Sequence, residues 1–125
     1  MIGVDLVKIE RIKKFTERFG DKALKKFLTP SEINLAKGVN TIAGFWAAKE
    51  AISKALGLGI SQRCSFFDIK IFKDEKNKPY FKLTKKLIEE FNIIDTDLSI
   101  THDDGYAIAV AHIETKTSSN EDISF

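Results

Sequence analysis

The predominant spacing of apolar residues along the chain changes at the glycine pair Gly57 and Gly59. Before this pair, long stretches carry apolar residues three or four positions apart, which is the period of an amphipathic helix. After it, apolar and polar residues alternate in short runs, which is typical of strands. A chain that separates helices and strands in this way favours a mainly antiparallel sheet. We therefore expect an α+β fold in which this sheet packs against a long central helix and shorter helices.

The first half of the chain is expected to contain one strand and three helices. Thr29 and Glu32 have the spacing of a capping box, in which a hydroxyl and a carboxylate satisfy free backbone donors at a helix start. Gly20 is a suitable end for the helix before it. In chain order, the expected elements are a strand over 2–7, a helix over 9–19, a helix capped by Thr29, and a long helix over 41–56.

The second half is expected to be mostly extended. A polar turn over 73–78 separates two alternating runs and predicts a hairpin. Asp103, Asp104 and Gly105 form a second turn between two further runs. The expected elements are strands over 67–72 and 80–83, a short helix over 87–91, and strands over 98–101 and 106–113.

Length and composition predict one globular domain. A chain of 125 residues with 43% hydrophobic and 30% charged residues has the composition of a soluble domain. We place this domain at residues 1–114 and expect residues 115–125, which are mostly small, polar or acidic, to form a loose tail. No apolar run reaches the roughly 18 to 20 residues of a membrane helix, so we expect a cytoplasmic protein without a membrane partner. Cys64 is the single cysteine and is expected to fill core space.

The net charge of +2 is unevenly distributed. Between Lys8 and Lys26 there are eight basic and three acidic residues, a local charge of +5, which leaves −3 for the remainder. Such a surface attracts acidic proteins, nucleic acid or phosphorylated molecules, although it can also be a merely solvated helix face. A nucleic-acid-binding module that uses this basic helix is one alternative function.

Two carboxylates stand out as candidate metal ligands. Asp5 lies in an apolar strand and needs a cation, which could be Arg11, Lys54 or a metal ion. Glu50 lies in the alanine-rich helix, four residues before Lys54, where a simple surface salt bridge is the ordinary interpretation. Taken together, Asp5 and Glu50 would suffice for Mg²⁺, which usually takes one or two protein carboxylates and fills its other positions with water and phosphate oxygens. Lys54 could then neutralise phosphate charge.

Other candidate residues give weaker signals. Gly57 and Gly59 permit close approach of a ligand, but they also serve as an ordinary helix terminator. His102 stands at a strand end, where a lone histidine is more often a hydrogen-bonded structural group than a metal ligand.

Three blocks of sequence resemble the 4′-phosphopantetheinyl transferase superfamily, in particular its small synthase branch. The first block runs from Ile2 to Arg11 and contains the pattern glycine, any residue, aspartate, followed six residues later by arginine. The second and most specific block runs from Trp46 to Gly59, and the third from Leu98 to His102. The order and spacing of the blocks also agree, and the resemblance covers nearly the whole chain except its tail.

The resemblance implies an enzyme that transfers the 4′-phosphopantetheine group of coenzyme A to a serine of apo acyl carrier protein, in support of fatty acid biosynthesis. Asp5 and Glu50 would hold Mg²⁺, with Glu50 and Lys54 as the catalytic residues. Lys54, Gly57, Gly59 and His102 would contact coenzyme A. Arg11, together with Lys14 and Arg18 on the basic helix, would bind the acidic carrier protein. The family also implies a homotrimer with active sites between neighbouring subunits.

Two positions depart from the family pattern. Phe45 stands where relatives usually have an arginine, so one contact to phosphate or to the carrier is either lost or supplied by Lys37. Asn77 replaces a glycine that commonly precedes the lysine and proline of the hairpin turn. Neither change affects the expected metal ligands or Lys54.

Overall fold

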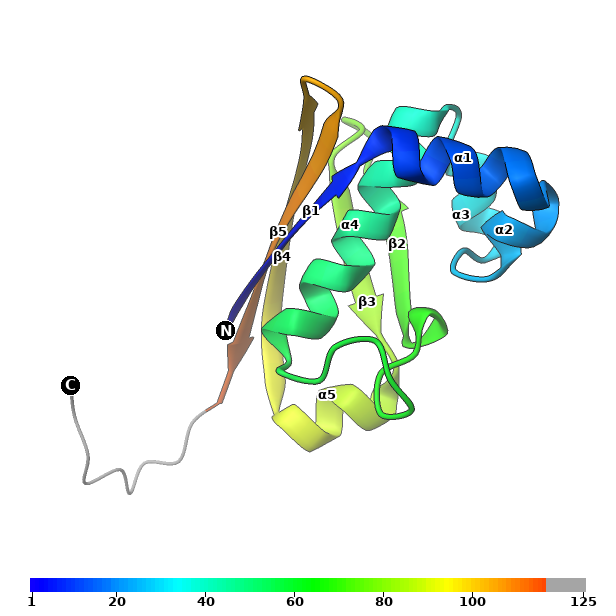
Figure 1. Ribbon diagram of the computed structural model, residues 1–125. Helices are drawn as coiled ribbons and strands as arrows, with labels where there is room; N and C mark the ends of the chain where they lie inside the picture. The colour runs from blue at the N-terminus through cyan, green and yellow to red at the C-terminus, as the bar shows by residue number, and fades with distance from the viewer. Residues whose placement is uncertain (117–125) are drawn as a thin grey trace.

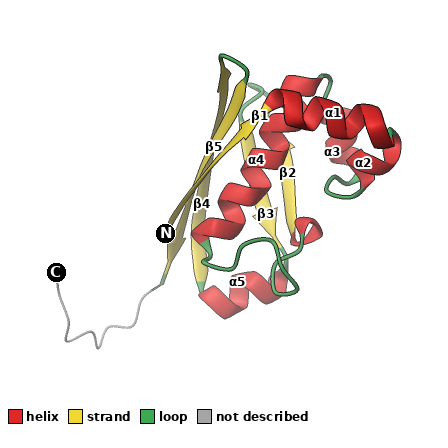
Figure 2. Cartoon of the chain, in the orientation of Figure 1, coloured by secondary structure: helices red, strands yellow, loops and turns green. Residues whose placement is uncertain are grey.

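The computed structural model describes residues 1–116 and has an α+β architecture, as the sequence predicts (Figures 1 and 2). The elements, in chain order, are β1 (Ile2–Lys8), α1 (Ile9–Phe19), α2 (Asp21–Lys25), α3 (Pro30–Leu35), α4 (Val39–Ala55), the 3₁₀ turn η1 (Phe66–Asp68), β2 (Ile69–Lys73), β3 (Pro79–Leu83), α5 (Lys85–Phe91), β4 (Ile93–Asp103) and β5 (Tyr106–Thr115).

The main sheet has three antiparallel strands in the order β1-β5-β4. Helix α4 runs along one face of this sheet, with α1 near the upper end of α4 in Figure 1. Strands β2 and β3 form a separate antiparallel pair on another side of α4. The expected long central helix packed against an antiparallel sheet is therefore confirmed.

Alanine and glycine let α4 lie very close to the main sheet. The sheet face toward α4 carries Ala107, Ala109 and Ala111 of β5, which are fully buried. At Gly3, an added Cβ would lie 1.9 Å from the carbonyl oxygen of Ala51, so β1 touches the helix backbone itself. This contact shows that Gly3 faces α4. Because side chains alternate along a strand, a residue two positions further along β1 faces the same way. Asp5 therefore faces the α4 side of β1.

The opposite face of the main sheet is apolar and exposed. Ile2, Val4 and Leu6 of β1 point away from α4, and Val4 is 55% exposed. Val110 of β5 is the register partner of Val4 and is also exposed. A contiguous exposed apolar face of this kind is a common mark of protein interfaces.

Several expected boundaries need correction. Phe67 was expected to begin a strand, but it lies in η1, where Ser65 and Asp68 form a capping box, and β2 begins at Ile69. Helix α4 begins at Val39 rather than at 41, and α2 was not predicted because five residues are too few to show a helical period. The capping box of Thr29 and Glu32 is confirmed.

Other expectations have mixed outcomes. Cys64 is fully buried, as predicted, and burial raises the pKa of its thiol to about 11. Within residues 1–116, no helix is both long and apolar enough to cross a membrane. The predicted loose tail over 115–125 lies almost wholly outside the described residues, and Thr115, its first residue, belongs to β5.

Candidate active site

Asp5 and Lys54 form an ion pair that joins β1 to α4. Lys54 Nζ lies 2.8 Å from Asp5 Oδ1 and 3.3 Å from the carbonyl oxygen of Val4. Asp5 is largely buried, whereas half of the Lys54 side chain is exposed. Lys54 therefore forms its ion pair with β1. The spacing alone favours a Glu50–Lys54 pair within the helix, but this pair is not among the described ion pairs.

Glu50 shares this site with Asp5. Burial is the largest cause that raises the pKa of Glu50 above its usual value, and the nearby Asp5 carboxylate raises it further. Lys54 and Arg11 act in the opposite direction. The structure thus brings together Asp5, Glu50 and Lys54, which we call the carboxylate cluster.

The carboxylate cluster suits a cation that takes few protein ligands. Two negatively charged carboxylates that lie close together gain from a positive charge between them. Among the described residues, no group of three or more His, Cys, Asp and Glu side chains could hold a metal ion. Zinc and calcium usually need more protein ligands than this, but Mg²⁺ bound with substrate phosphate does not. The donor set therefore fits the Mg²⁺ expected from the sequence.

A groove beside α1 lies next to the carboxylate cluster. Its cavity volume is about 320 Å³, and we call it the α1 groove. Trp46 of α4 lies in its lining, and the guanidinium of Arg11 lies 5.9 Å from the centre of the Trp46 ring. The lining residues are Arg11, Ile12, Lys14, Phe15, Arg18, Phe19 and Trp46. The groove thus combines aromatic and apolar side chains with all three basic residues expected to bind a partner.

His102 belongs to a different cleft, of about 290 Å³, which we call the His102 cleft. It is lined by Asn40, Thr41, Phe45, Lys73, Asn77, Pro79, Ile100 and His102. Phe45 is buried, and Lys73 Nζ lies 5.8 Å from the centre of its ring. The lysine beside Phe45 is therefore Lys73, whereas Lys37 is not among the residues lining the cleft. Asn77 has φ of 66°, a left-handed conformation that favours glycine, in agreement with the glycine expected there from the family resemblance.

Gly57 and Gly59 follow the end of α4 in left-handed backbone conformations. Their φ angles are 75° and 63°, and an added Cβ would meet nothing within 4 Å at either position. Both amides donate to carbonyl oxygens of the last turn of α4, at Lys54 and Ser53. The backbone conformation accounts for both glycines, and the open space beside them leaves room for a ligand.

The carboxylate cluster and the His102 cleft lie on different sides of α4. Asp5 is on β1 and His102 is on β4, the two outer strands of the main sheet. Glu50 and Phe45 are five positions apart, so their side chains leave the helix about 140° apart at 3.6 residues per turn. Within a single chain, the site residues predicted from the sequence therefore do not all lie close to one another.

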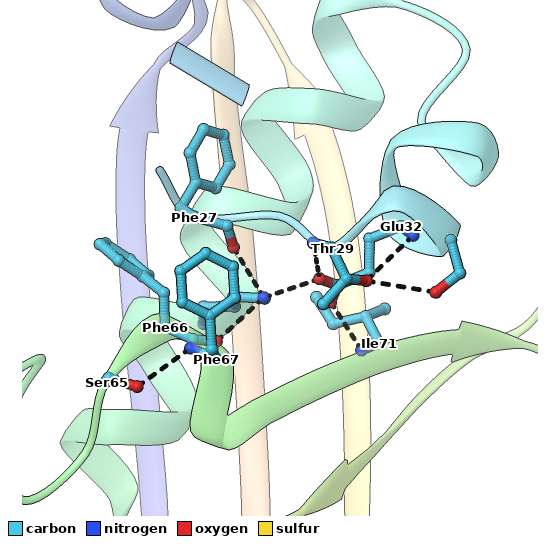
Figure 3. A network of polar contacts seen from close by, with 9 residues as sticks. Phe27, Thr29, Glu32, Ser65, Phe66, Phe67 and Ile71 are labelled. Carbon is cyan, nitrogen blue, oxygen red and sulfur yellow. Dashed lines mark hydrogen bonds and ion pairs between the residues drawn. The ribbon is translucent and has the colours of Figure 1, made fainter. Parts of the chain in front are cut away.

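A further buried ion pair, which no sequence pattern indicates, joins Lys49 of α4 to Glu32 of α3. Lys49 and Glu32 are both fully buried, with Lys49 Nζ 2.9 Å from Glu32 Oε1. Lys49 also donates to the carbonyl oxygens of Phe27 at 2.7 Å and Phe66 at 3.0 Å. Burial lowers the pKa of Lys49, and the Glu32 carboxylate opposes this effect. Figure 3 shows the polar contacts of this network converging between α3 and η1.

The Glu32 carboxylate completes the network. Its Oε1 accepts from the Thr29 amide at 2.7 Å, and its Oε2 accepts from the Ile71 amide at 2.8 Å (Figure 3). Removing one partner of such a buried pair typically costs about 3–5 kcal/mol, because the other charge is left without compensation. The capping box was a signal for Glu32, but nothing in the sequence marks Lys49 as buried.

The family comparison agrees with this geometry. A family model described as the 4′-phosphopantetheinyl transferase superfamily matches residues 1–111. The chain belongs to this superfamily. The match includes all the residues of the carboxylate cluster, the α1 groove and the His102 cleft.

Relatives within the superfamily are similar over most of the chain. The holo-acyl-carrier-protein synthase of Nautilia profundicola is 59% identical over 109 residues, covering 87% of this chain and 95% of the relative. The synthase of Sulfurimonas denitrificans is 52% identical over 121 residues, covering 97% and 99%. The crystal structure of Helicobacter pylori holo-acyl-carrier-protein synthase in complex with coenzyme A superposes with a TM-score of 0.89 at 50% identity, covering 91% of this chain and 100% of that one.

Proposed function

We propose that this chain transfers the 4′-phosphopantetheine group of coenzyme A to a serine of apo acyl carrier protein, giving holo acyl carrier protein for fatty acid biosynthesis. The observation that carries the proposal is the carboxylate cluster, where β1 and α4 bring Asp5, Glu50 and Lys54 together. The names of the curated relatives and the coenzyme A complex of the Helicobacter pylori structure support the same reaction. The catalytic domain is proposed to span residues 1–114, in a cytoplasmic protein.

The reaction is an attack on a pyrophosphate. The serine Oγ bonds to the β-phosphorus of coenzyme A, and the bond from that phosphorus to the bridging oxygen breaks. Adenosine 3′,5′-bisphosphate leaves with the bridging oxygen and its electron pair, and the serine proton passes to a base. Glu50, directly or through a water molecule, is the proposed base, because its carboxylate in the carboxylate cluster can accept a proton.

Each member of the carboxylate cluster has a proposed role. Asp5 and Glu50 would hold Mg²⁺, which supplies charge stabilisation to the pyrophosphate oxygens when bound. Lys54 would exchange its contact with Asp5 for the pyrophosphate, because half of its side chain is exposed to solvent. Gly57 and Gly59 would border the coenzyme A chain, because the space beside them is open.

The α1 groove is the proposed surface for the carrier protein. An acidic partner would meet Arg11, Lys14 and Arg18 at the lining of the groove, where apolar and aromatic side chains can receive an apolar side chain of the partner. Arg11 also influences Glu50 electrostatically, so the groove borders the carboxylate cluster. A serine on a carrier bound there would reach the reacting phosphorus from this side of α4.

The complete active site is proposed to lie between subunits of a homotrimer. The His102 cleft lies on the other side of α4 from the carboxylate cluster, so the nucleotide end of coenzyme A would be held by His102 of a second copy. The exposed apolar face of Ile2, Val4, Leu6 and Val110 offers a surface for that assembly. Lys73, beside Phe45, would supply positive charge where relatives usually have an arginine.

The proposal is tested by following the second product. The protein is incubated with coenzyme A, Mg²⁺ and apo acyl carrier protein, and adenosine 3′,5′-bisphosphate is measured by liquid chromatography. Release should require the carrier, stop with EDTA, and stop when the acceptor serine of the carrier is changed to alanine. Release without a carrier would indicate hydrolysis instead, and no release with several carriers would contradict the proposal.

A further inference from the structure

The buried Lys49–Glu32 pair holds the residues that surround Trp46. Lys49 binds the carbonyl oxygens of Phe27 and Phe66, and the rings of the same two residues lie 5.0 and 5.2 Å from the Trp46 ring. Figure 3 shows dashed lines from Phe27, Phe66 and Glu32 meeting at one nitrogen, which is Lys49 Nζ. One ammonium group therefore fixes the backbone behind both aromatic neighbours of Trp46.

Trp46 in turn supports the α1 groove. Its ring contacts Phe15 of α1, with ring centres 6.4 Å apart, and it lies under the Arg11 guanidinium. Arg11 lies over this ring while it also acts on Glu50. A shift of Trp46 would move both the lining of the groove and the Arg11 guanidinium above the ring.

We propose that the Lys49–Glu32 pair is a positioning device for the α1 groove: it holds Trp46 between Phe27 and Phe66, and through Trp46 it sets the place of Arg11 for binding the acidic carrier. The inference rests on the proposed function for the identity of the carrier. Lys49 and Glu32 are both fully buried, so they are positioning residues rather than catalytic ones.

The chemistry of the Lys49–Glu32 pair indicates that it orients neighbouring segments rather than adding to the stability of the fold. Replacing a buried ion pair by apolar side chains of similar volume is often neutral or stabilising, so stability alone gives little reason for such a pair. Directional hydrogen bonds, in contrast, fix where partners lie. Here they tie α3, α4, η1, β2 and the segment after α2 to a single point.

Trp46 provides a direct optical test because it is the only tryptophan in the chain. Its emission spectrum and its quenching by acrylamide are measured in the wild-type protein, in Lys49→Met, and in the double variant Lys49→Met/Glu32→Leu. A red shift and stronger quenching in both variants are expected. Arg63→Met is the matched control, because it removes a charge from the exposed Arg63–Glu90 pair, and it should leave the emission unchanged.

Steady-state kinetics separates positioning from stability. In the double variant, the unfolding midpoint should recover relative to Lys49→Met, because no unpaired charge remains buried. The KM for the carrier should nevertheless stay about three- to tenfold above the wild-type value, while the KM for coenzyme A changes by less than about twofold. Recovery of the carrier KM together with stability would show a purely structural role and overturn the proposal.

The optical result stands independently of the enzymatic assay. Wild-type emission in the double variant would overturn the proposal even if transfer were impaired. A wild-type protein that modifies no carrier would instead contradict the proposed function, and the Trp46 spectra would still decide whether the ion pair positions the groove. If Lys49→Met fails to fold, the double variant carries both measurements.

Discussion

Gly3 shows how a single residue sets the geometry of the site. Its replacement by alanine would place a Cβ 1.9 Å from the Ala51 carbonyl oxygen and 2.6 Å from the Ala55 amide nitrogen. Because backbone atoms cannot rotate away as side chains do, β1 must move off α4, which is expected to cost about 3 kcal/mol or more. Urea unfolding measures this loss. Gly38→Ala, where a Cβ meets nothing within 4 Å, should cost less than about 1 kcal/mol, and equal losses would contradict the account.

At the same scale, the sequence marked Asp5 and Lys54 as candidate site residues but left their contacts open. Asp5 was expected to pair with Arg11, Lys54 or a metal, and the structure selects Lys54 among the side chains. The burial of Lys49 could not be predicted, because a lysine among alanines in the middle of a helix is expected to be exposed. Its burial depends on three carbonyl and carboxylate oxygens from segments distant in sequence.

At the scale of the elements, Asp68 in the η1 turn predicts how the stability of the fold depends on pH. Asp68 is largely buried, and although burial opposes it, hydrogen bonds from the Ser65 amide, Thr84 and Lys86 hold its pKa below the usual value. A pKa lowered by folding contributes stability above the unfolded pKa of about 3.9, and this contribution is lost as pH falls through the folded pKa. Asp68→Asn should therefore lower stability by about 1–2 kcal/mol at pH 7 and by progressively less below about pH 4.

Urea titrations between pH 7 and pH 3 measure this difference. Asp104→Asn is a suitable control, because Asp104 is exposed at the β4–β5 turn and asparagine tolerates its φ of 50°. A constant difference between Asp68→Asn and the wild type at every pH would rule out the ionised carboxylate as the cause.

Element prediction succeeded where a pattern was long, and its failures fall in short segments. The alternation over 106–113 correctly predicted β5, and the three-to-four spacing correctly predicted α1. The alternation that included Phe67 was wrong, because the Ser65–Asp68 capping box starts a 3₁₀ turn inside it. Local hydrogen bonds of this kind override a period-two pattern only a few residues long.

For the whole molecule, the account predicts that the outer sheet face controls assembly. Val4 lies in the middle of that face and is exposed in the single chain, so Val4→Glu should leave the fold intact. Burying its carboxylate between subunits would be costly, so the variant should sediment as a monomer and lose most of its transfer activity. Ile94→Glu changes an exposed apolar residue outside this face and should retain assembly. A fully active monomer would contradict the intersubunit site.

Transfer of phosphopantetheine by this molecule is proposed to depend on its two carboxylates, Asp5 and Glu50. The most direct test is the intact mass of an apo acyl carrier protein after incubation with coenzyme A and Mg²⁺, using the wild type, Glu50→Gln, and the exposed control Glu89→Gln. The account predicts a mass gain of one phosphopantetheine group with the wild type and Glu89→Gln, and almost none with Glu50→Gln or with EDTA. An unmodified carrier with the wild type, or an equal gain with Glu50→Gln, would contradict it.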